Sequence, residues 1–226
     1  MKTSASLLQR LLLAAACLAL TTAATAQHDD DPLDGKQIGV IGDSYVRNHR
    51  EPVENTWHYK LAKKHHMTYY NYGRNGSCVA MDRQRFGPAV YKRYKDMKDS
   101  LDYVVVIAGH NDAALLDTVG MDNYREKLDV LCRGLLERYP LAHIYFFTCW
   151  ANDNPAFLRI VDATKDVCGS HGIPVFDAAR QSNIHARSDA FRREFFQGRG
   201  VNDHAHLNAK GHDRFLPIAE KFILAH

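Results

Sequence analysis

The sequence predicts an α/β fold in which helices cover both faces of a parallel β-sheet. Short apolar runs alternate with helix-like stretches along most of the chain, as in proteins built from repeated strand-helix units. The run Tyr103–Ala108 is apolar on both faces of a strand, which is typical of a central parallel strand. The chain has 226 residues, 46% of them hydrophobic, so we expect one domain with a substantial core and no second domain.

The first half of the domain shows two strand-helix units. Ile38–Ile41 is a short apolar run and predicts a strand, and Thr56–His66 predicts a helix capped by Asn55. Thr68–Tyr72 is rich in aromatic residues and predicts the second strand, followed by a helix at Gly87–Lys98.

The middle of the chain gives the clearest strand and helix. Leu101–Gly109 contains the central apolar run, and Met121–Arg138 predicts a helix that Pro140 ends. The apolar residues of this helix recur at spacings of three and four: Tyr124, Leu128, Leu131 and Leu135.

The last third continues the alternation. We expect a strand at His143–Trp150, a helix at residues 154–170, a strand at Ile173–Ala178 and a closing helix at residues 208–226. No internal repeat or low-complexity segment competes with this assignment.

The N-terminal segment has the features of a secretory signal peptide. Lys2 and Arg10 precede the apolar run Leu11–Leu20, and the small residues Ala24–Ala26 stand before Gln27. The apolar run is too short to anchor the mature chain across a bilayer. We therefore expect an exported protein with no transmembrane segment in the mature chain.

The expected organisation is a signal peptide at residues 1–26, a polar leader at residues 27–35 and one domain at residues 36–226. Anchoring as a lipoprotein through Cys17 is the less favoured alternative, because Ala14 stands where an acylation site prefers Leu.

The charge of the mature chain is close to balanced. Removal of the signal peptide would take away Lys2 and Arg10 from 29 basic side chains and none of the 26 acidic ones, so the formal charge falls from +3 to +1. This balance gives no reason to expect nucleic acid or an anionic membrane as a partner. We interpret the basic stretch Tyr91–Lys98 as the solvated face of a helix, and the oligomeric state stays open.

Four cysteines remain after removal of the signal peptide: Cys78, Cys132, Cys149 and Cys168. Their even number permits two disulfides in an oxidising compartment, but the pairing cannot be deduced. Buried free thiols are equally compatible with a core of this size.

Polar motifs follow the predicted strands, where the chemistry of such folds lies. They are Gly42–Ser44, Asn71–Ser77 and Ala108–Asp112, with Val201–Asn208 before the last helix. These four blocks, in this order, resemble the SGNH (GDSL-type) hydrolase family over residues 36–226. The resemblance implies a three-layer α/β/α fold with a flavodoxin-like parallel sheet of about five strands, and a serine hydrolase that cleaves esters.

By this resemblance Ser44 is the nucleophile, which needs a base to take its proton. A Ser at this position is also common at the N-terminus of a helix, and the two roles are compatible. His206 is the base, because Asp203 and His206 have the D-x-x-H spacing that places both on one face of a helical turn. His204 stands where the family commonly has Gly. We keep His206 as the base because its run to Asn208 matches the family better, and the role of His204 stays open.

The resemblance assigns the oxyanion hole to the backbone amides of Ser44 and Gly76 and the side-chain amide of Asn111, each donor worth roughly 3 kcal/mol. Gly73 is the alternative for the second donor. Asp112 is interpreted as a supporting residue.

No metal or organic cofactor is implied. Asp and His can bind zinc, so we considered a site at His204, His206 and His212. The first two project differently on a turn and the third falls in the last helix, so this site is not favoured. Several side chains near the motifs could form a sugar-binding surface, although core packing is their commoner role: Tyr45, Arg47, His49, Trp57, Arg74 and Trp150.

The expected function is an exported serine esterase that removes a small acyl group, acetyl first, from an alcohol oxygen on a carbohydrate or similar small molecule. Lipid-ester and thioester hydrolysis stay open, and the alternative is a non-catalytic secreted glycan-binding module with the same fold. The acyl chain length cannot be read from the sequence.

Overall fold

The computed structural model of the protein describes residues 31–198 and 201–226. The expected signal peptide, residues 1–26, lies outside the described residues, as do residues 27–30 of the leader. Among the described helices, none combines the length and apolarity that crossing a bilayer requires.

A single parallel sheet organises residues 35–226, the larger of two compact units of the chain. Within the described part of this unit, five strands pair in the order β2-β1-β3-β4-β5, which is the flavodoxin-like order. The predicted α/β fold is therefore confirmed. The strands are β1 (Gln37–Gly42), β2 (Thr68–Gly73), β3 (Tyr103–Ile107), β4 (His143–Phe147) and β5 (Val175–Phe176).

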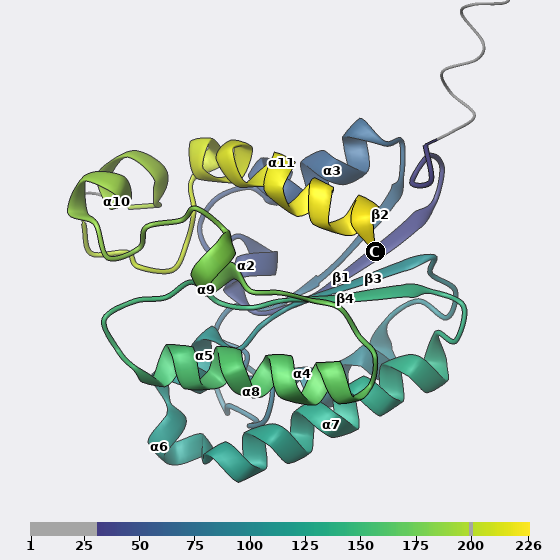
Figure 1. Cartoon of the computed structure of the whole chain (residues 1–226), viewed down its shortest axis with the longest axis horizontal. Coiled ribbons are helices and arrows are strands. Elements are labelled where there is room, and N and C mark those ends of the chain that lie inside the picture. The colour runs from purple at the N-terminus through teal and green to yellow at the C-terminus, as the bar shows by residue number, and fades with distance from the viewer. Residues whose placement is uncertain (1–30, 199–200) are drawn as a thin grey trace, which may run out of the picture. The chain divides into compact units, whose positions relative to one another are not determined.

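Helices cover both faces of the sheet (Figure 1). Those on one face are α3 (Trp57–Lys64) and α11 (Ala209–Ala225). Those on the other are α4 (Val90–Arg93), α7 (Met121–Arg138) and α8 (Ala156–Ser170). Short elements lie in the connections: α2 (Ser44–Arg47), α5 (His110–Ala114), α6 (Leu116–Val119), α9 (Ala178–Gln181), α10 (Asp189–Phe195) and the 3₁₀ turns η1 (Val53–Asn55) and η2 (Tyr94–Asp96).

Apolar side chains fill the space on both sides of the sheet. On one side Trp57 of α3 packs edge to face on Phe215 of α11, with ring centroids 5.6 Å apart, and lies 4.8 Å from the ring of Phe147 in β4. On the other side the hydroxyl groups of Tyr124 in α7 and Thr164 in α8 form a hydrogen bond of 2.8 Å. All residues of β3 are buried, as predicted for a central strand.

The helix predicted at Gly87–Lys98 is wrong in length. Gly87 has a left-handed φ of +79° and pairs with Arg83 in an antiparallel bridge, so no helix can begin there. Only Val90–Arg93 is α-helical, and the chain then tightens into η2. The interpretation of this stretch as a solvated face is also wrong in part, because the side chain of Arg93 is buried.

Two smaller differences concern element ends. The cap of α3 is Thr56, whose hydroxyl accepts from the Tyr59 amide, and not Asn55. The last strand is shorter than predicted, because Asp177 already caps α9 by accepting from the Arg180 amide.

The four cysteines of the domain are buried free thiols. Sγ of Cys132 on α7 and Sγ of Cys168 on α8 lie 3.7 Å apart, well beyond the length of a disulfide. Of the two alternatives that the sequence left open, the structure has the free thiols.

Candidate active site

The turn that carries Ser44 follows β1 directly. Gly42 leaves β1 so close to β3 that a Cβ at this position would lie 1.8 Å from the carbonyl oxygen of Ile107, so only glycine fits. Asp43 then caps α2 by accepting a hydrogen bond of 2.9 Å from the Tyr45 amide. Ser44 is the first residue of α2, at the carboxyl edge of the sheet.

His206 links Ser44 to Asp203. Nε2 of His206 lies 2.8 Å from Oγ of Ser44, and Nδ1 lies 2.9 Å from Oδ2 of Asp203. With the ring proton on Nδ1, the ring donates to Asp203 and accepts from the hydroxyl of Ser44. The structure thus brings together all three residues that the sequence put forward as a catalytic group.

The local structure of Asp203–His206 differs from the predicted helical turn. Oδ1 of Asp203 accepts hydrogen bonds of 2.9 Å from the amides of Ala205 and His206, which is the geometry of an Asx turn. Nε1 of Trp150, just beyond β4, donates to the carbonyl oxygen of Ala205 at 2.7 Å and holds this loop over the sheet edge.

The same contacts keep Asp203 ionised. Burial by itself would raise the pKa of Asp203, but the hydrogen bond and charge of His206 and the two backbone amides outweigh it, so the pKa lies below its ordinary value. A carboxylate is therefore available to orient the imidazole and to balance a positive charge on it.

Asn111 reaches the same edge from β3. It is the second residue of α5, and its Nδ2 donates to the carbonyl oxygen of Ser77 at 3.0 Å and lies 3.5 Å from Oδ2 of Asp43. Asp112, its neighbour, is fully buried and accepts from the amides of Val79 and Ala80. Asp112 thus fixes the loop after β2, as expected of a supporting residue.

The loop after β2 contains both candidate glycines. The amide of Gly73 already donates to Oδ1 of Asn71 at 2.9 Å. Gly76 has a φ of +72°, and in the part of the chain that the structure describes its amide has no acceptor, as is also true of the amide of Ser44. The geometry therefore favours Gly76 over Gly73 as a free donor.

Arg93 is a residue that the sequence interpretation missed. Its guanidinium group donates to the carbonyl oxygens of Gly42 and Tyr72, each at 2.8 Å, and to Oγ of Ser77 at 3.1 Å. It thereby ties the end of β1 to the end of β2 and to the following loop. Its place in a basic run gave no signal of this role.

A cavity of about 750 Å³ opens beside the imidazole of His206. Nine of its thirteen described lining residues have polar or charged side chains, and the lining comes from segments far apart in the sequence. The residues are Arg50, His110, Ala114, Asn152, Asp153, Asn154, Phe157, Gly198, Asn202, Asp203, His204, Ala205 and His206. His204 therefore lies at this cavity and not in the hydrogen-bonded group with Ser44.

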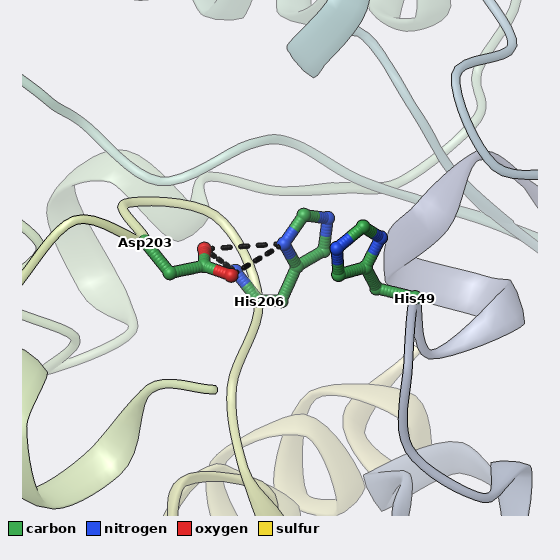
Figure 2. Close-up of side chains that lie close together, drawn as sticks. All are labelled: His49, Asp203 and His206. Atoms are coloured by element: carbon green, nitrogen blue, oxygen red, sulfur yellow. Dashed lines mark hydrogen bonds and ion pairs between the residues drawn. The ribbon is translucent and has the colours of Figure 1, made fainter. Parts of the chain in front are cut away.

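His49 lies against the face of His206 (Figure 2). Among the described residues, His49, Asp203 and His206 form a group whose possible metal-binding atoms lie within 4.8 Å of one another. The two imidazole planes are almost parallel, at 10°, with centroids 4.0 Å apart, so their in-plane lone pairs do not converge on a common point. His212, from the zinc site considered on sequence grounds, is buried in α11 and hydrogen-bonds to the Trp57 amide.

The aromatic residues considered as a sugar-binding surface belong to the core. Tyr45, Trp57 and Trp150 are buried, and the rings of Tyr45 and Trp150 stack with centroids 5.0 Å apart. Arg47 and Arg74 are exposed.

A comparison with protein-family models matches residues 40–214 to the GDSL-like Lipase/Acylhydrolase family. The comparison with curated proteins found no match.

Solved structures of similar fold cover most of the chain. A protein from Lactobacillus plantarum is 20% identical with a TM-score of 0.73, over 85% of this chain and 98% of its own. A member of the lipolytic protein G-D-S-L family from Veillonella parvula is 15% identical with a TM-score of 0.57, over 82% and 96%. A carbohydrate esterase family 2 enzyme with a carbohydrate-binding domain, from Corynascus thermopiles (Myceliophthora fergusii), is 18% identical with a TM-score of 0.62, over 86% and 67%. At these identities the likeness shows the fold.

Proposed function

Because the chain belongs to the GDSL-like lipase/acylhydrolase family of carboxylic ester hydrolases, we propose that it is an exported serine esterase that removes a small acyl group, acetyl first, from a carbohydrate hydroxyl. The observation that carries the proposal is the continuous hydrogen-bonded path from Ser44 through His206 to Asp203, with distances of 2.8 and 2.9 Å.

The first chemical step is attack of Oγ of Ser44 on the ester carbonyl carbon. Nε2 of His206 takes the hydroxyl proton as the new C–O bond forms, and Asp203 stabilises the imidazolium through Nδ1. Collapse of the tetrahedral intermediate breaks the bond to the alcohol oxygen, which leaves with the proton from His206. Water then attacks the acyl-enzyme by the same route and releases the carboxylic acid.

The oxyanion of each intermediate needs donors that are already in place. The free amides of Ser44 and Gly76 and the second N–H of the Asn111 side-chain amide are the groups that we propose for this role. One N–H of that amide is engaged by the Ser77 carbonyl oxygen at 3.0 Å, and the other makes only a long contact of 3.5 Å with Oδ2 of Asp43, which a substrate oxygen can replace.

The lining of the cavity supports a polar substrate. Asn152, Asn154 and Asn202 offer both donors and acceptors, as the hydroxyl groups of a sugar require. Among the described lining residues, the apolar side chains are those of Ala114, Phe157 and Ala205, and none of them belongs to a continuous aliphatic channel of the kind that a long acyl chain fills. Structural likeness to a carbohydrate esterase of family 2 points in the same direction.

Export is proposed from the sequence of residues 1–26. Expression of the full chain in a bacterial host, followed by cell fractionation and N-terminal sequencing, tests it. Mature protein that begins at Gln27 in the periplasm or the medium supports export, and uncleaved cytoplasmic protein contradicts it.

A fluorophosphonate that reacts with activated serines tests the nucleophile. We expect one label per chain at Ser44 and none in Ser44→Ala. Labelling of the Ala variant at undiminished stoichiometry would overturn the assignment.

Chromogenic acetyl, butyryl and octanoyl esters, an acetyl thioester and an acetylated oligosaccharide then rank the substrates. Turnover that falls steeply beyond acetyl supports a small-acyl esterase. The highest kcat/KM on octanoyl would favour lipid esters, the highest on the thioester would favour thioesters, and no turnover of any ester would favour a glycan-binding module.

A further inference from the structure

His49 covers one face of the imidazole of His206 (Figure 2). The ring planes differ by only 10° and the centroids lie 4.0 Å apart. The ring of Tyr45 lies nearly perpendicular to that of His206, at 89°, with the centroids 6.2 Å apart. His206 is thus held by its two hydrogen bonds in the ring plane and by His49 above that plane.

We propose that His49 is a positioning residue of this esterase: its ring keeps the imidazole of His206 in the plane that joins Asp203 to Ser44, and stabilises the imidazolium formed during attack. The inference rests on the proposed function, because it requires that His206 become charged in the reaction.

The backbone at His49 has an unusual conformation. His49 has a φ of +45°, and the preceding Asn48 has a φ of +64°. Two successive non-glycine residues in the left-handed region are uncommon, and such conformations persist where the surroundings enforce them, often at functional sites.

Buried hydrogen bonds enforce the conformation at Asn48. Its Nδ2 donates to the carbonyl oxygen of Pro52 at 2.6 Å, and its Oδ1 accepts from Nε2 of Gln197 at 2.9 Å. Nε2 of His212 lies 3.2 Å from the same Oδ1. Since Asn48 is only 2% exposed, these contacts fix the path of the chain just before His49.

His49 itself is tied to the two loops that supply the other reactive groups. Its amide donates to the carbonyl oxygen of Ser44 at 3.2 Å. Its carbonyl oxygen accepts from Nδ2 of Asn75 at 3.3 Å, next to Gly76. The stacked ring is therefore positioned by the same turn that holds the nucleophile.

The charges around His49 favour its uncharged form. Burial lowers its pKa, and the positive charges of His206 and Arg50 lower it further, against the opposite effect of Asp203. An uncharged aromatic ring next to His206 can stabilise a cation on that residue, whereas a charged one would oppose it.

The effect belongs to the transition state. The imidazolium exists only while Ser44 or water attacks, so a group that stabilises it raises kcat and leaves ground-state binding little changed. A cation–π contact of the usual strength corresponds to about a three- to tenfold effect on kcat.

His49→Leu and His49→Phe separate the ring face from its bulk. Both residues carry the same backbone restriction at positive φ, but only Phe keeps a flat π face. His143→Leu is the matched control, because His143 also stacks on a ring, that of Tyr103 at 5.0 Å and 14°, but at the opposite end of the sheet. The measured quantities are kcat per site titrated with a fluorophosphonate, KM on a soluble acetyl ester, and Tm.

We expect His49→Leu to lower kcat per titrated site about three- to tenfold with KM nearly constant, and His49→Phe to keep most of the wild-type kcat. His143→Leu should match the wild type. Wild-type kcat in His49→Leu, or equal losses in the Leu and Phe variants, would overturn the inference. His206→Ala, with turnover expressed per mole of protein because the probe needs an activated serine, distinguishes the two failures: full turnover there would contradict the proposed function, whereas loss there with an unaffected His49→Leu would contradict only the role of His49.

Discussion

The guanidinium group of Arg93 donates a hydrogen bond of 2.8 Å to the carbonyl oxygen of Gly42, two residues before Ser44. The same side chain holds the carbonyl oxygen of Tyr72 and Oγ of Ser77. A buried charge is costly unless such acceptors surround it. Burial lowers the pKa of Arg93 to about 10, so the side chain remains charged at neutral pH. Its hydrogen bonds connect the end of β1 to the end of β2.

Arg93→Met should therefore destabilise the protein. It removes four hydrogen bonds that the guanidinium group makes to Pro88, Tyr72, Gly42 and Ser77, although the carbonyl oxygen of Gly42 keeps the Arg74 amide as a donor. We expect a cost of about 3 kcal/mol, which lowers Tm by about 6 to 12 °C in a domain of this size. Differential scanning calorimetry measures the shift. The control is Arg125→Met, which removes an exposed ion pair with Asp166 and should shift Tm by less than about 2 °C. Equal Tm values for both variants would show that Arg93 has no such role.

Asp43 should make stability depend on pH in an unusual direction. It is fully buried, and burial raises its pKa from 3.8 to about 7. Between about pH 4 and pH 7 the unfolded chain has released the proton that the folded chain still holds. Because the folded state then binds more protons, its stability falls as pH rises through this window, and the loss is complete above pH 7.

Asp43→Asn removes this titration while keeping an oxygen for the Tyr45 amide. The Tm of the variant minus the Tm of the wild type should therefore increase from pH 4 to pH 8, because only the wild type loses stability as pH rises. A constant effect of the new side chain on Tm would not change this trend. Asp117→Asn, at an exposed position of α6, is the control for loss of a carboxyl group that is not buried. A pH-independent difference for Asp43→Asn would mean that this carboxyl group is not protonated in the folded state near neutral pH.

The two histidines of the last motif should differ in the kinetic parameter that they affect. His206→Ala removes the proposed base, so kcat should fall about 10³-fold or more. His204 lines the cavity without bonding to Ser44, so His204→Ala should act mainly through KM, by less than about tenfold. Steady-state kinetics on a soluble acetyl ester checks both. If His204→Ala gave the larger loss of kcat, the register of the motif would be wrong.

The elements predicted well are those whose pattern repeats within the element. α7 was predicted well because its apolar residues recur from Tyr124 to Leu135, over about three turns, and β3 was recognisable because both its faces are apolar. Short helices such as α5 and α10 offer too few turns for a period. The site residues could be proposed from the order of their motifs.

Residues whose role depends on being buried could not be predicted from the motifs of the sequence. Arg93 reads as one cation in a basic run, and only the fold turns it inward. The cavity is also beyond sequence reasoning, because His110, Asn152 and Asn202 meet there only after the sheet has formed. The predicted helical turn at Asp203 failed because its carboxylate competes for the local amides and stabilises an Asx turn.

Asn111 is expected to act on the transition state. One N–H of its amide is held by the Ser77 carbonyl oxygen at 3.0 Å, and the other makes only a long contact of 3.5 Å with Oδ2 of Asp43, which the substrate oxygen can replace as Ser44 attacks. Charge builds on that oxygen only during attack, so the donor lowers the barrier without tightening ground-state binding. Asn111→Ala should therefore reduce kcat about 10²- to 10³-fold while KM changes little.

Loss of the bond to Ser77 could by itself disturb the loop after β2, and Asn123→Ala controls for this. Nδ2 of Asn123 donates to the carbonyl oxygen of Ala80 at 3.3 Å, so it anchors the same loop away from Ser44. With kcat expressed per site titrated by a fluorophosphonate, Asn123→Ala should stay within about threefold of the wild type, because the two neutral hydrogen bonds of its Nδ2, to the carbonyl oxygens of Ala80 and Val119, each contribute little. Similar losses in the two variants would assign Asn111 to loop anchoring, and a raised KM with kcat intact would assign it to substrate binding; either result would remove it from the oxyanion hole.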